Sequence, residues 1–417
     1  MGLPLGLSLV RAGVQVVGVD SSAARRQTLT RGESPIDDVT DDEVARALDH
    51  GLTLRSPADG RLDEVDAVFV CVPTPITAAR DPDLSAVLAA ARLVSASLRR
   101  GHLIVLQSTT YPGTTSGPFR GQLERSGLIA GRDFALAYAP ERVNPGDPAS
   151  SRGPLPRLVG GVTRADGAPA ARLLRLLGGD VLELSSPDAA ELAKLLENVF
   201  RNVNIALVNQ LRLLCERMGL DVWEIIDAAA TKPFGFMPLR PGPGVGGHCI
   251  PVVPYYLSWR AWQFGITDRF VELAGDINVS MPHHVVDLVA TALNDRRQAT
   301  RGSRVGVLGV AFKPNVSDTR NAPAAEIIAL LSSRGARVVY HDPLVESFRD
   351  AAGQDYHSTT LDDLLLTTDI VIALVGHQRI DWHAVYARAP LVVDTVGTPR
   401  ARELAERQVL RLGTGWS

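Results

Sequence analysis

The stretch between Pro187 and Gly219 contains no further proline or glycine, and it predicts one long helix. Ser186 is a good N-cap, Pro187 suits the first helical position, and Gly219 can end the helix. A helix of this length reaches ~48 Å at 1.5 Å per residue, so it can form a spine between two domains. Its periodicity predicts a buried stripe made of Leu192, Leu195, Leu196, Val199, Phe200 and Val203.

Short β-rich runs alternate with helical segments on both sides of this helix. Before it, strands are expected over 14–20, 67–72, 103–107 and 134–138, with a helix over 84–99. After it, strands are expected over 304–308, 337–341, 370–374 and 391–394, with a helix over 323–334. This rhythm predicts an α/β fold with two Rossmann-like domains joined by the long central helix and a helical core. The expected domains are 1–183, 184–298 and 299–417.

The charge and cysteine content exclude several classes of function. The formal net charge is -3, with Lys and Arg scattered along the chain, so neither nucleic acid nor a membrane is expected as a partner. No apolar run approaches the ~18 residues that span a bilayer. Three cysteines in 417 residues do not make a disulfide framework, so reduced thiols and a cytoplasmic setting are expected.

Asp20 is a candidate for binding a dinucleotide, because it ends the apolar strand pattern 16–20. An acidic residue at this point accepts hydrogen bonds from the adenosine ribose hydroxyls, which favours NAD over NADP. The alternative is an ordinary turn aspartate. The glycine loop that binds the pyrophosphate should precede Asp20 by about 20 residues, but only its tail is present, from Gly2 to Gly6. The first strand of the N-terminal sheet is therefore expected to be missing.

The most informative stretch is 233–251, which is rich in glycine and proline. Such a run is a loop that lets the backbone approach a ligand closely. Cys249 lies within it, so this thiol is expected to be accessible and able to act as a nucleophile. Cys71 and Cys215 are interpreted as small core residues.

The run Gly-Pro-Gly-Val-Gly-Gly-His-Cys-Ile-Pro at 242–251 resembles the active-site loop of the UDP-glucose/GDP-mannose dehydrogenase family. Other segments similar to this family follow in order along nearly the whole chain: Val-Pro-Thr-Pro at 72–75, Ser-Thr at 108–109, Pro-Gly-Thr-Thr at 112–115, Pro-Glu-Arg at 140–142, Glu191 with Lys194 and Asn198, Phe-Lys-Pro-Asn at 312–315 and Asp-Thr-Arg at 318–320. The resemblance implies an NAD-binding domain, a helical dimerisation core, a UDP-binding domain and a homodimer.

The resemblance also implies two successive oxidations at C6 of a UDP-sugar with two NAD. The first gives an aldehyde, the Cys249 thiolate adds to it, the thiohemiacetal is oxidised to a thioester, and water releases a uronic acid. The expected catalytic residues are Cys249, Lys194, Asn198, Glu141 and Thr109. The expected NAD-binding residues are Gly2, Asp20, Arg25, Pro73, Thr74, Ser108, Thr109 and Arg320. The expected substrate-binding residues are Glu141, Arg142, Lys194, Asn198, Arg240, Gly246 and Lys313, and no metal is expected.

The residue types suit these roles. Lys194 and Asn198 lie four residues apart and share one helix face, so their donors can stabilise an oxyanion at C6. Glu141 can position or deprotonate water for thioester hydrolysis, and its alternative role is a salt bridge with Arg142.

Val253, Gln107, Arg240 and Met1 depart from the family pattern: Gln107 stands where Glu is common, and Arg240 where an aromatic residue is common. Val253 stands where the family carries an aspartate four residues after the nucleophile. Because a catalytic carboxylate is worth ~10²–10⁴ in rate, its absence predicts slow hydrolysis and an accumulating acyl-enzyme. Met1 stands where the family's glycine loop has valine. GTG codes for valine and is also a bacterial start codon, so we hypothesise that translation begins upstream.

The loop sequences most resemble the UDP-N-acetylglucosamine branch of the family, and N-acetylmannosamine and other acylamino sugars stay open. Three alternatives are a UDP-glucose 6-dehydrogenase, a catalytically impaired nucleotide-sugar-binding homologue and a β-hydroxyacid dehydrogenase. A β-hydroxyacid dehydrogenase needs neither Cys249 nor a second α/β unit. The impaired nucleotide-sugar-binding homologue is favoured by Val253 and the shortened glycine loop.

Overall fold

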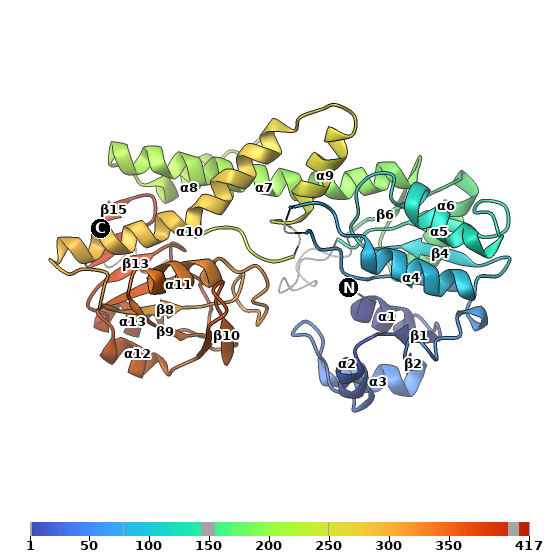
Figure 1. Cartoon of the computed structure of the whole chain (residues 1–417), viewed down its shortest axis with the longest axis horizontal. Coiled ribbons are helices and arrows are strands. Elements are labelled where there is room, and N and C mark those ends of the chain that lie inside the picture. Colours follow the sequence, from blue (N-terminus) through green and yellow to red (C-terminus); the bar gives the residue numbers. More distant parts are fainter. Residues whose placement is uncertain (1, 78, 143–154, 249, 399–407, 417) are drawn as a thin grey trace. The chain divides into compact units, whose positions relative to one another are not determined.

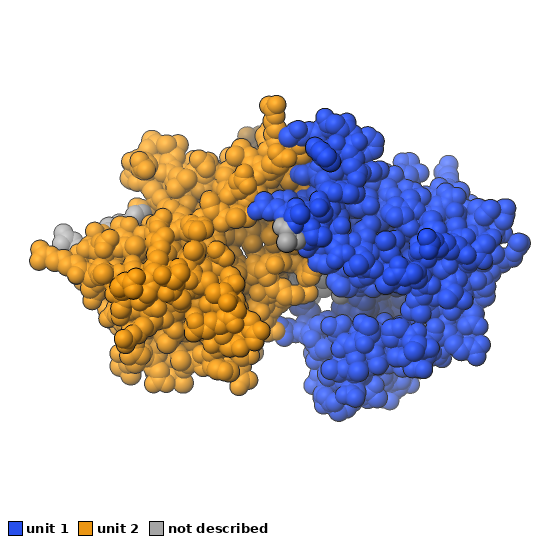
Figure 2. All heavy atoms as spheres, viewed as in Figure 1, with its two compact units in different colours: residues 1–197, 255–267 blue, residues 198–254, 268–417 orange. Residues whose placement is uncertain are grey.

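The computed structural model describes residues 2–77, 79–142, 155–248, 250–398 and 408–416. The chain divides into two compact units (Figure 2): Met1–Glu197 with Tyr255–Thr267, and Asn198–Pro254 with Asp268–Ser417. The division into three domains stays a prediction.

The first unit is built around a five-stranded sheet with the order β3-β4-β5-β6-β7. Its strands are β3 (Ala67–Val70), β4 (Leu103–Leu106), β5 (Ala135–Tyr138), β6 (Arg157–Gly161) and β7 (Val181–Leu184). The neighbours β3, β4 and β5 are parallel, whereas β6 runs antiparallel to β5 and parallel to β7.

Helices cover both faces of this sheet, because side chains along each strand alternate between them. Ile104 and Leu106 of β4 pack on the face of α4 (Ser85–Ala96) and α5 (Arg120–Leu123). Leu103 and Val105 pack on the other face, against α1 (Gly2–Arg11) and α6 (Arg164–Arg175). Short η2 (Thr115–Phe119) and η3 (Glu124–Ser126) flank α5.

A smaller lobe precedes the sheet (Figure 1, blue). It contains α1, β1 (Val16–Val19), α2 (Ala23–Thr30), α3 (Asp41–His50), β2 (Leu52–Arg55) and η1 (Leu62–Glu64). The parallel strands β1 and β2 form a separate two-stranded sheet, and within the described residues no ladder joins β1 to β3.

Helix α7 (Pro187–Met218) has the predicted bounds. The Ser186 hydroxyl accepts a hydrogen bond from the Ala189 N–H at 3.1 Å, and Gly219 has φ +69°, so both predicted ends are confirmed. The predicted buried stripe is partly wrong. Leu195 and Val199 are buried, but Leu192, Leu196 and Phe200 are exposed. Instead, α7 buries polar side chains on its inward face: Glu191, Lys194, Asn198, Asn202, Asn209 and Arg212.

The second unit holds a six-stranded sheet with the order β15-β14-β13-β12-β8-β9, in which only β15 is antiparallel. Its strands are β8 (Arg304–Leu308), β9 (Arg337–His341), β12 (Ile370–Ala373), β13 (Val392–Asp394), β14 (Val409–Arg411) and β15 (Gly415–Trp416). A small antiparallel pair, β10 (Ser347–Arg349) and β11 (Asp355–His357), lies apart from it.

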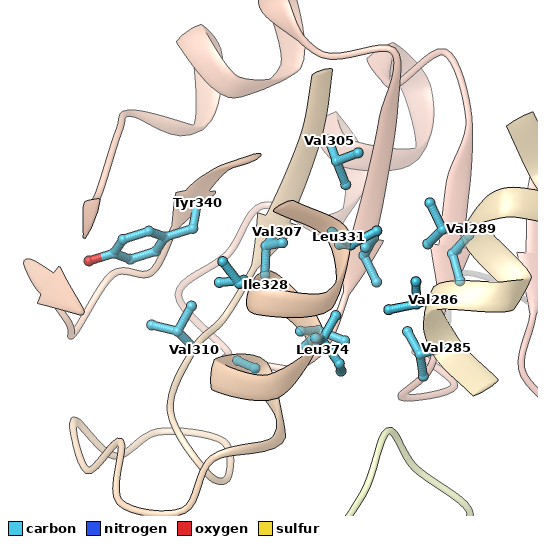
Figure 3. Close-up of a cluster of buried hydrophobic side chains, with 14 of the residues drawn as sticks. Val285, Val286, Val289, Val305, Val307, Val310, Ile328, Leu331, Tyr340 and Leu374 are labelled. Carbon is cyan, nitrogen blue, oxygen red and sulfur yellow. The ribbon is translucent and has the colours of Figure 1, made fainter. Parts of the chain in front are cut away.

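Helices of the second unit are α8 (Val222–Ala230), α10 (Arg269–Asp295), α11 (Pro323–Ser333), α12 (Leu361–Thr367) and α13 (Trp382–Arg388). Figure 3 shows Val285, Val286 and Val289 of α10 facing α11. These valines form one buried core with Ile328 and Leu331 of α11 and with Val305 and Val307 of β8. Helix α9 (Val253–Trp262) has its first two residues in this unit, and the rest of it belongs to the first unit. None of the helices described is long and apolar enough to cross a membrane.

Candidate active site

The predicted NAD-binding residues of the first unit follow the carboxyl ends of β1, β3 and β4. Asp20 follows β1; its carboxylate accepts a hydrogen bond from the Ser22 N–H at 2.8 Å and pairs with Arg25 Nη1 at 2.9 Å. Pro73 and Thr74 follow β3, and Ser108 follows β4. In open α/β sheets, ligands bind outside the carboxyl ends of the strands.

Two further contacts support a dinucleotide at this edge. The Ser108 hydroxyl donates to the Val72 carbonyl at 2.7 Å, so the loops after β3 and β4 are joined. Helix α1 begins at Gly2, and a Cβ on this residue would lie 3.4 Å from Cys71 Cβ, just after β3. The α1 N-terminus therefore lies beside the same edge, and backbone amides at a helix N-terminus suit a pyrophosphate. These residues fit NAD, which Gly2, Asp20 and Ser108 would contact.

Lys194 lies in a buried polar group of the first unit. It is 9% exposed, and its Nζ is 3.8 Å from Glu197 Oε2. Glu197 Oε1 also pairs with Arg142 Nη2 at 2.6 Å, and Arg142 donates to the Pro156 carbonyl. Glu141 Oε1 accepts a hydrogen bond from the backbone N–H of Arg142 at 2.7 Å. The structure therefore brings Arg142 to Lys194 through Glu197, a residue that the sequence analysis missed.

Asn198 follows Lys194 by one helical turn and is also buried. Its Nδ2 is buried without a hydrogen-bond partner in the part of the chain that the structure describes. Leaving a buried donor unsatisfied costs about 1–3 kcal/mol, so this amide suits an oxygen atom of a ligand.

Cys249 lies outside the described residues, but the residues before it are held tightly in the second unit. The Gly247 N–H donates to the Arg320 carbonyl at 3.0 Å, and Asn321 Nδ2 donates to the Gly247 carbonyl at 3.0 Å. A Cβ on Gly246 would lie 2.8 Å from Phe312 Cβ. Any larger residue at 246 would therefore displace the loop that leads to Cys249.

Three buried asparagines anchor the start of the same loop. The Gly242 N–H donates to Asn209 Oδ1 at 3.1 Å, and Asn209 Nδ2 donates to Asn278 Oδ1 at 3.0 Å. Asn278 Nδ2 then donates to Asn202 Oδ1 at 2.9 Å. This chain of amides ties the loop to α7 and α10. The sequence signal was available, because polar residues recur at helical spacing along α7 from Glu191 to Asn209.

A pocket of about 490 Å³ lies in the second unit. Its wall contains residues 241–244 of the cysteine loop, 311–314 after β8, 374–378 after β12 and 395–398 after β13. Strand β8 lies between β9 and β12, so the pocket is at the switch point of the sheet, where nucleotides bind in open α/β folds. Lys313, a predicted substrate ligand, is part of the wall.

The turn that follows β8 already binds a carboxylate of the protein itself. Asp342, just after β9, accepts hydrogen bonds from the Val310 N–H at 2.8 Å and the Ala311 N–H at 3.3 Å, and it contacts His377 Nε2 at 3.2 Å. Burial acts to raise the pKa of Asp342, but the hydrogen bonds from His377 and Val310 hold that pKa below its usual range. Because a carboxylate already binds these amides, this turn is not available to a dinucleotide phosphate.

The remaining predicted residues have other neighbours. Arg240 pairs with Asp227 and lies with its guanidinium carbon 5.8 Å from the centre of the Trp223 ring. The Arg320 side chain pairs with Asp318, with Nε 2.9 Å from Oδ1. Contacts of Arg240 and Arg320 with substrate or cofactor stay predictions. Among the described residues, no group of three or more His, Cys, Asp or Glu side chains could hold a metal ion.

Val253 and His248 lie on either side of the nucleophile in the sequence. Val253 is 4% exposed and begins α9. Burial and the nearby Arg320 guanidinium lower the pKa of His248, so its imidazole is neutral near pH 7.

Comparison with known proteins identifies the family. Residues 1–177 match the NAD binding domain of the UDP-glucose/GDP-mannose dehydrogenase family, residues 188–280 its central domain and residues 306–399 its UDP binding domain. The chain is 34% identical to the UDP-N-acetyl-D-mannosamine dehydrogenase of Salmonella typhi, over 96% of this chain and 97% of that protein. It is 32% identical to the NDP-N-acetyl-D-galactosaminuronic acid dehydrogenase of Ralstonia nicotianae, over 97% and 95%.

A solved structure agrees with the sequence matches. The UDP-D-ManNAc dehydrogenase of Pyrococcus horikoshii superposes with a TM-score of 0.87 at 30% identity, over 99% of this chain and 97% of that one. The Rossmann-like α/β fold and the NAD-binding domain expected from the sequence are thus confirmed. The chain belongs to the UDP-glucose/GDP-mannose dehydrogenase family of NAD-dependent nucleotide-sugar dehydrogenases.

Proposed function

We propose that this enzyme oxidises the C6 hydroxyl of a UDP-N-acetylhexosamine to the carboxylate in two NAD-dependent steps, with Cys249 as the nucleophile. One observation carries the proposal. The loop that leads to Cys249 forms a wall of the nucleotide pocket at 241–244, and its Gly247 is held by Asn321 and the Arg320 carbonyl. A nucleotide in this pocket would place its sugar near the nucleophile's loop.

NAD supplies the hydride acceptor in both oxidations. In the first, C6 loses a hydride and its hydroxyl gives a proton to solvent water, while Lys194 and the unsatisfied Asn198 amide donate hydrogen bonds to the C6 oxygen as C6 becomes an aldehyde. The Cys249 thiolate then adds to the aldehyde carbon and forms a thiohemiacetal, whose oxygen the same donors hold. The second oxidation gives a thioester, and water held by Glu141 and Thr109 hydrolyses it to the carboxylate and the free thiol.

An acylamino sugar is the substrate class that the relatives support. The Salmonella relative is named for UDP-N-acetyl-D-mannosamine, and the Ralstonia relative for N-acetyl-D-galactosaminuronic acid. The loop sequence favours UDP-N-acetylglucosamine, and the names of the relatives favour UDP-N-acetylmannosamine. Both are therefore the first substrates to test. Initial rates of NADH formation are measured with both, with UDP-N-acetylgalactosamine and with UDP-glucose. We expect one of the acylamino sugars to give the highest kcat/KM, and a higher value for UDP-glucose would contradict the assignment.

An impaired nucleotide-sugar binder is the second candidate, and the buried Val253 favours it. A valine cannot accept a proton or hold a water molecule. Binding of the UDP-sugars by calorimetry without NADH formation from any of them would establish this alternative.

We also propose that the enzyme is a cytoplasmic homodimer. Phe200, Leu207 and Leu214 are exposed at intervals of seven residues on α7, and Met218 extends their row. Apolar residues at heptad spacing form the seam between packed helices, and a second copy would cover them. The reduced thiol that Cys249 needs as a nucleophile fits the cytoplasm.

A further inference from the structure

Glu191 is a fully buried carboxylate in the first unit, and the mechanism above gives it no role. Its Oε1 accepts hydrogen bonds from the Thr110 hydroxyl at 3.1 Å, the Thr115 N–H at 2.9 Å and the Thr115 hydroxyl at 2.7 Å. Its Oε2 accepts one from the Gly113 N–H at 2.7 Å. All four donors belong to one loop, 76 to 81 residues away in the sequence. Burying a charged carboxylate costs free energy unless it accepts hydrogen bonds. The four uncharged donors that converge on Glu191 offset this cost.

These contacts join two parts of the predicted catalytic machinery. The loop 108–115 carries Thr109, next to Thr110. Lys194 follows Glu191 by three residues on α7 and therefore lies on the same helix face. The carboxylate thus connects the segment holding Thr109 directly to the helix turn holding Lys194.

The loop is shaped to reach this carboxylate. Gly113 has φ +95°, a conformation that favours glycine, and a Cβ there would lie 2.8 Å from Arg260 Nη2. This turn directs the Gly113 N–H to Glu191. Beside it, the Ser116 hydroxyl donates to Asp188 Oδ1 at 2.7 Å, a second and separate link between the loop and α7.

We propose that Glu191 is a positioning residue, whose ionised carboxylate fixes the loop 108–115 to α7 and so sets the distance between Thr109 and Lys194. The inference rests on the proposed function for its effect on turnover. The contact between the loop and the helix itself does not depend on which substrate is used.

The protonation state of Glu191 then matters for the loop. Burial raises the pKa of Glu191 to about 7, against the opposing effect of the hydrogen bonds from Thr115 and Gly113. The titratable groups that face it are Asp188, which also raises its pKa, and the neutral phenols of Tyr111 and Tyr138, whose own pKa values Glu191 helps to raise. The ionised form can accept all four hydrogen bonds. The protonated form must donate its O–H, and the two backbone amides cannot accept it.

Glu191→Gln tests the proposal, because a glutamine keeps one oxygen and replaces the other with an NH₂ group that cannot accept from Gly113. A displacement of about 1 Å near the reacting atoms can cost on the order of 10²-fold in rate. We therefore expect kcat to fall ~10²-fold above pH 8, with a small change in KM for the UDP-sugar. The ratio of wild-type to variant kcat should rise with pH through about 7, and titration of Cys249 cancels in this ratio because both proteins have the thiol.

Thr115 provides a matched pair of variants. Thr115→Val removes one donor at nearly constant volume and should lower kcat, whereas Thr115→Ser keeps the hydroxyl and should restore it. Ser116→Ala removes the neighbouring link to Asp188 and should leave the pH dependence of kcat unchanged. A kcat ratio for Glu191→Gln that is flat with pH, or equal rates for the two Thr115 variants, would overturn the proposal.

Hydrogen exchange separates this inference from the proposed function. Exchange of the amides in a peptide covering 110–116 is followed by mass spectrometry with the full-length protein and no substrate. We expect faster exchange in Glu191→Gln than in the wild type at the same pH. Unchanged exchange would overturn the positioning role of Glu191 even if the enzyme is active. Faster exchange supports it even if no UDP-sugar gives NADH, a result that would refute only the proposed function.

Discussion

Gly246→Ala should disable the enzyme by displacing the cysteine loop. The added Cβ would lie 2.8 Å from Phe312 Cβ, 3.0 Å from the Asn321 carbonyl oxygen and 3.0 Å from Pro323 Cδ. Carbon atoms normally pack at about 3.5–4.0 Å, so the loop or the Phe312 segment must move by roughly 0.7–1 Å. Forcing a methyl group into a packed site costs about 1–3 kcal/mol, which the loop can reduce by moving.

The effect on turnover follows from the position of Cys249, three residues after Gly246. A displacement of about 1 Å should lower kcat on the order of 10²-fold. Gly121→Ala is the control, because a Cβ there has nothing within 4 Å and Gly121 lies in α5, outside the pocket and the cysteine loop; it should keep kcat within about 2-fold. Initial rates of NADH formation are measured at saturating NAD and UDP-sugar, together with the melting temperature. Equal rates for the two variants would refute the reasoning.

Three further predictions follow from the structure. Val253→Asp should raise steady-state turnover by on the order of 10-fold or more, because a carboxylate at the start of α9 can support the hydrolytic water; an unchanged rate after the NADH burst would contradict this. The unfolding free energy of the wild type should fall by on the order of 3 kcal/mol between about pH 4.5 and 7. The folded Glu191 keeps its proton up to a pKa of about 7, whereas the unfolded chain loses it near 4.5. Denaturant titrations should show that this fall is diminished in Glu191→Gln. Leu207→Glu combined with Leu214→Glu should convert the proposed dimer to a monomer in analytical ultracentrifugation, and an unchanged mass would place the interface elsewhere.

The ends of α7 could be predicted from the sequence because capping is local chemistry. Ser186, Pro187 and Gly219 act on the backbone next to them, and the structure has the predicted helix bounds. Which face of α7 is buried could not be predicted in the same way. Leu196 is 61% exposed while Asn198 is buried, because burial depends on the segments that surround the helix.

The sheets show the same difference between local and distant information. The strand patterns of β4, β8 and β9 were found because each is a compact β-rich run. Strand β6 was missed; it ends in two glycines and pairs antiparallel with β5. Pairing partners lie far apart in the sequence, so the periodicity of one strand does not reveal them.

In the candidate site, motifs located the segments but not their partners. The glycine-rich run predicted a loop that approaches a ligand, and the structure places residues 241–244 of this run in the pocket wall. Glu197 and Asn278 were missed because each is a single polar residue outside any motif, whereas Asn209 continues the row of polar residues along α7. Their roles depend on contacts between helices, which only the folded chain reveals.

We propose that Cys249 is the nucleophile through which this enzyme completes two oxidations of one UDP-sugar. The most direct test follows NADH absorbance and uronic acid in one reaction with NAD and a UDP-N-acetylhexosamine, and records the intact mass of the enzyme during turnover. We expect two NADH for each uronic acid, with an acyl adduct on Cys249 that disappears in Cys249→Ser. One NADH for each product with an aldehyde released, or full turnover by Cys249→Ser, would contradict it.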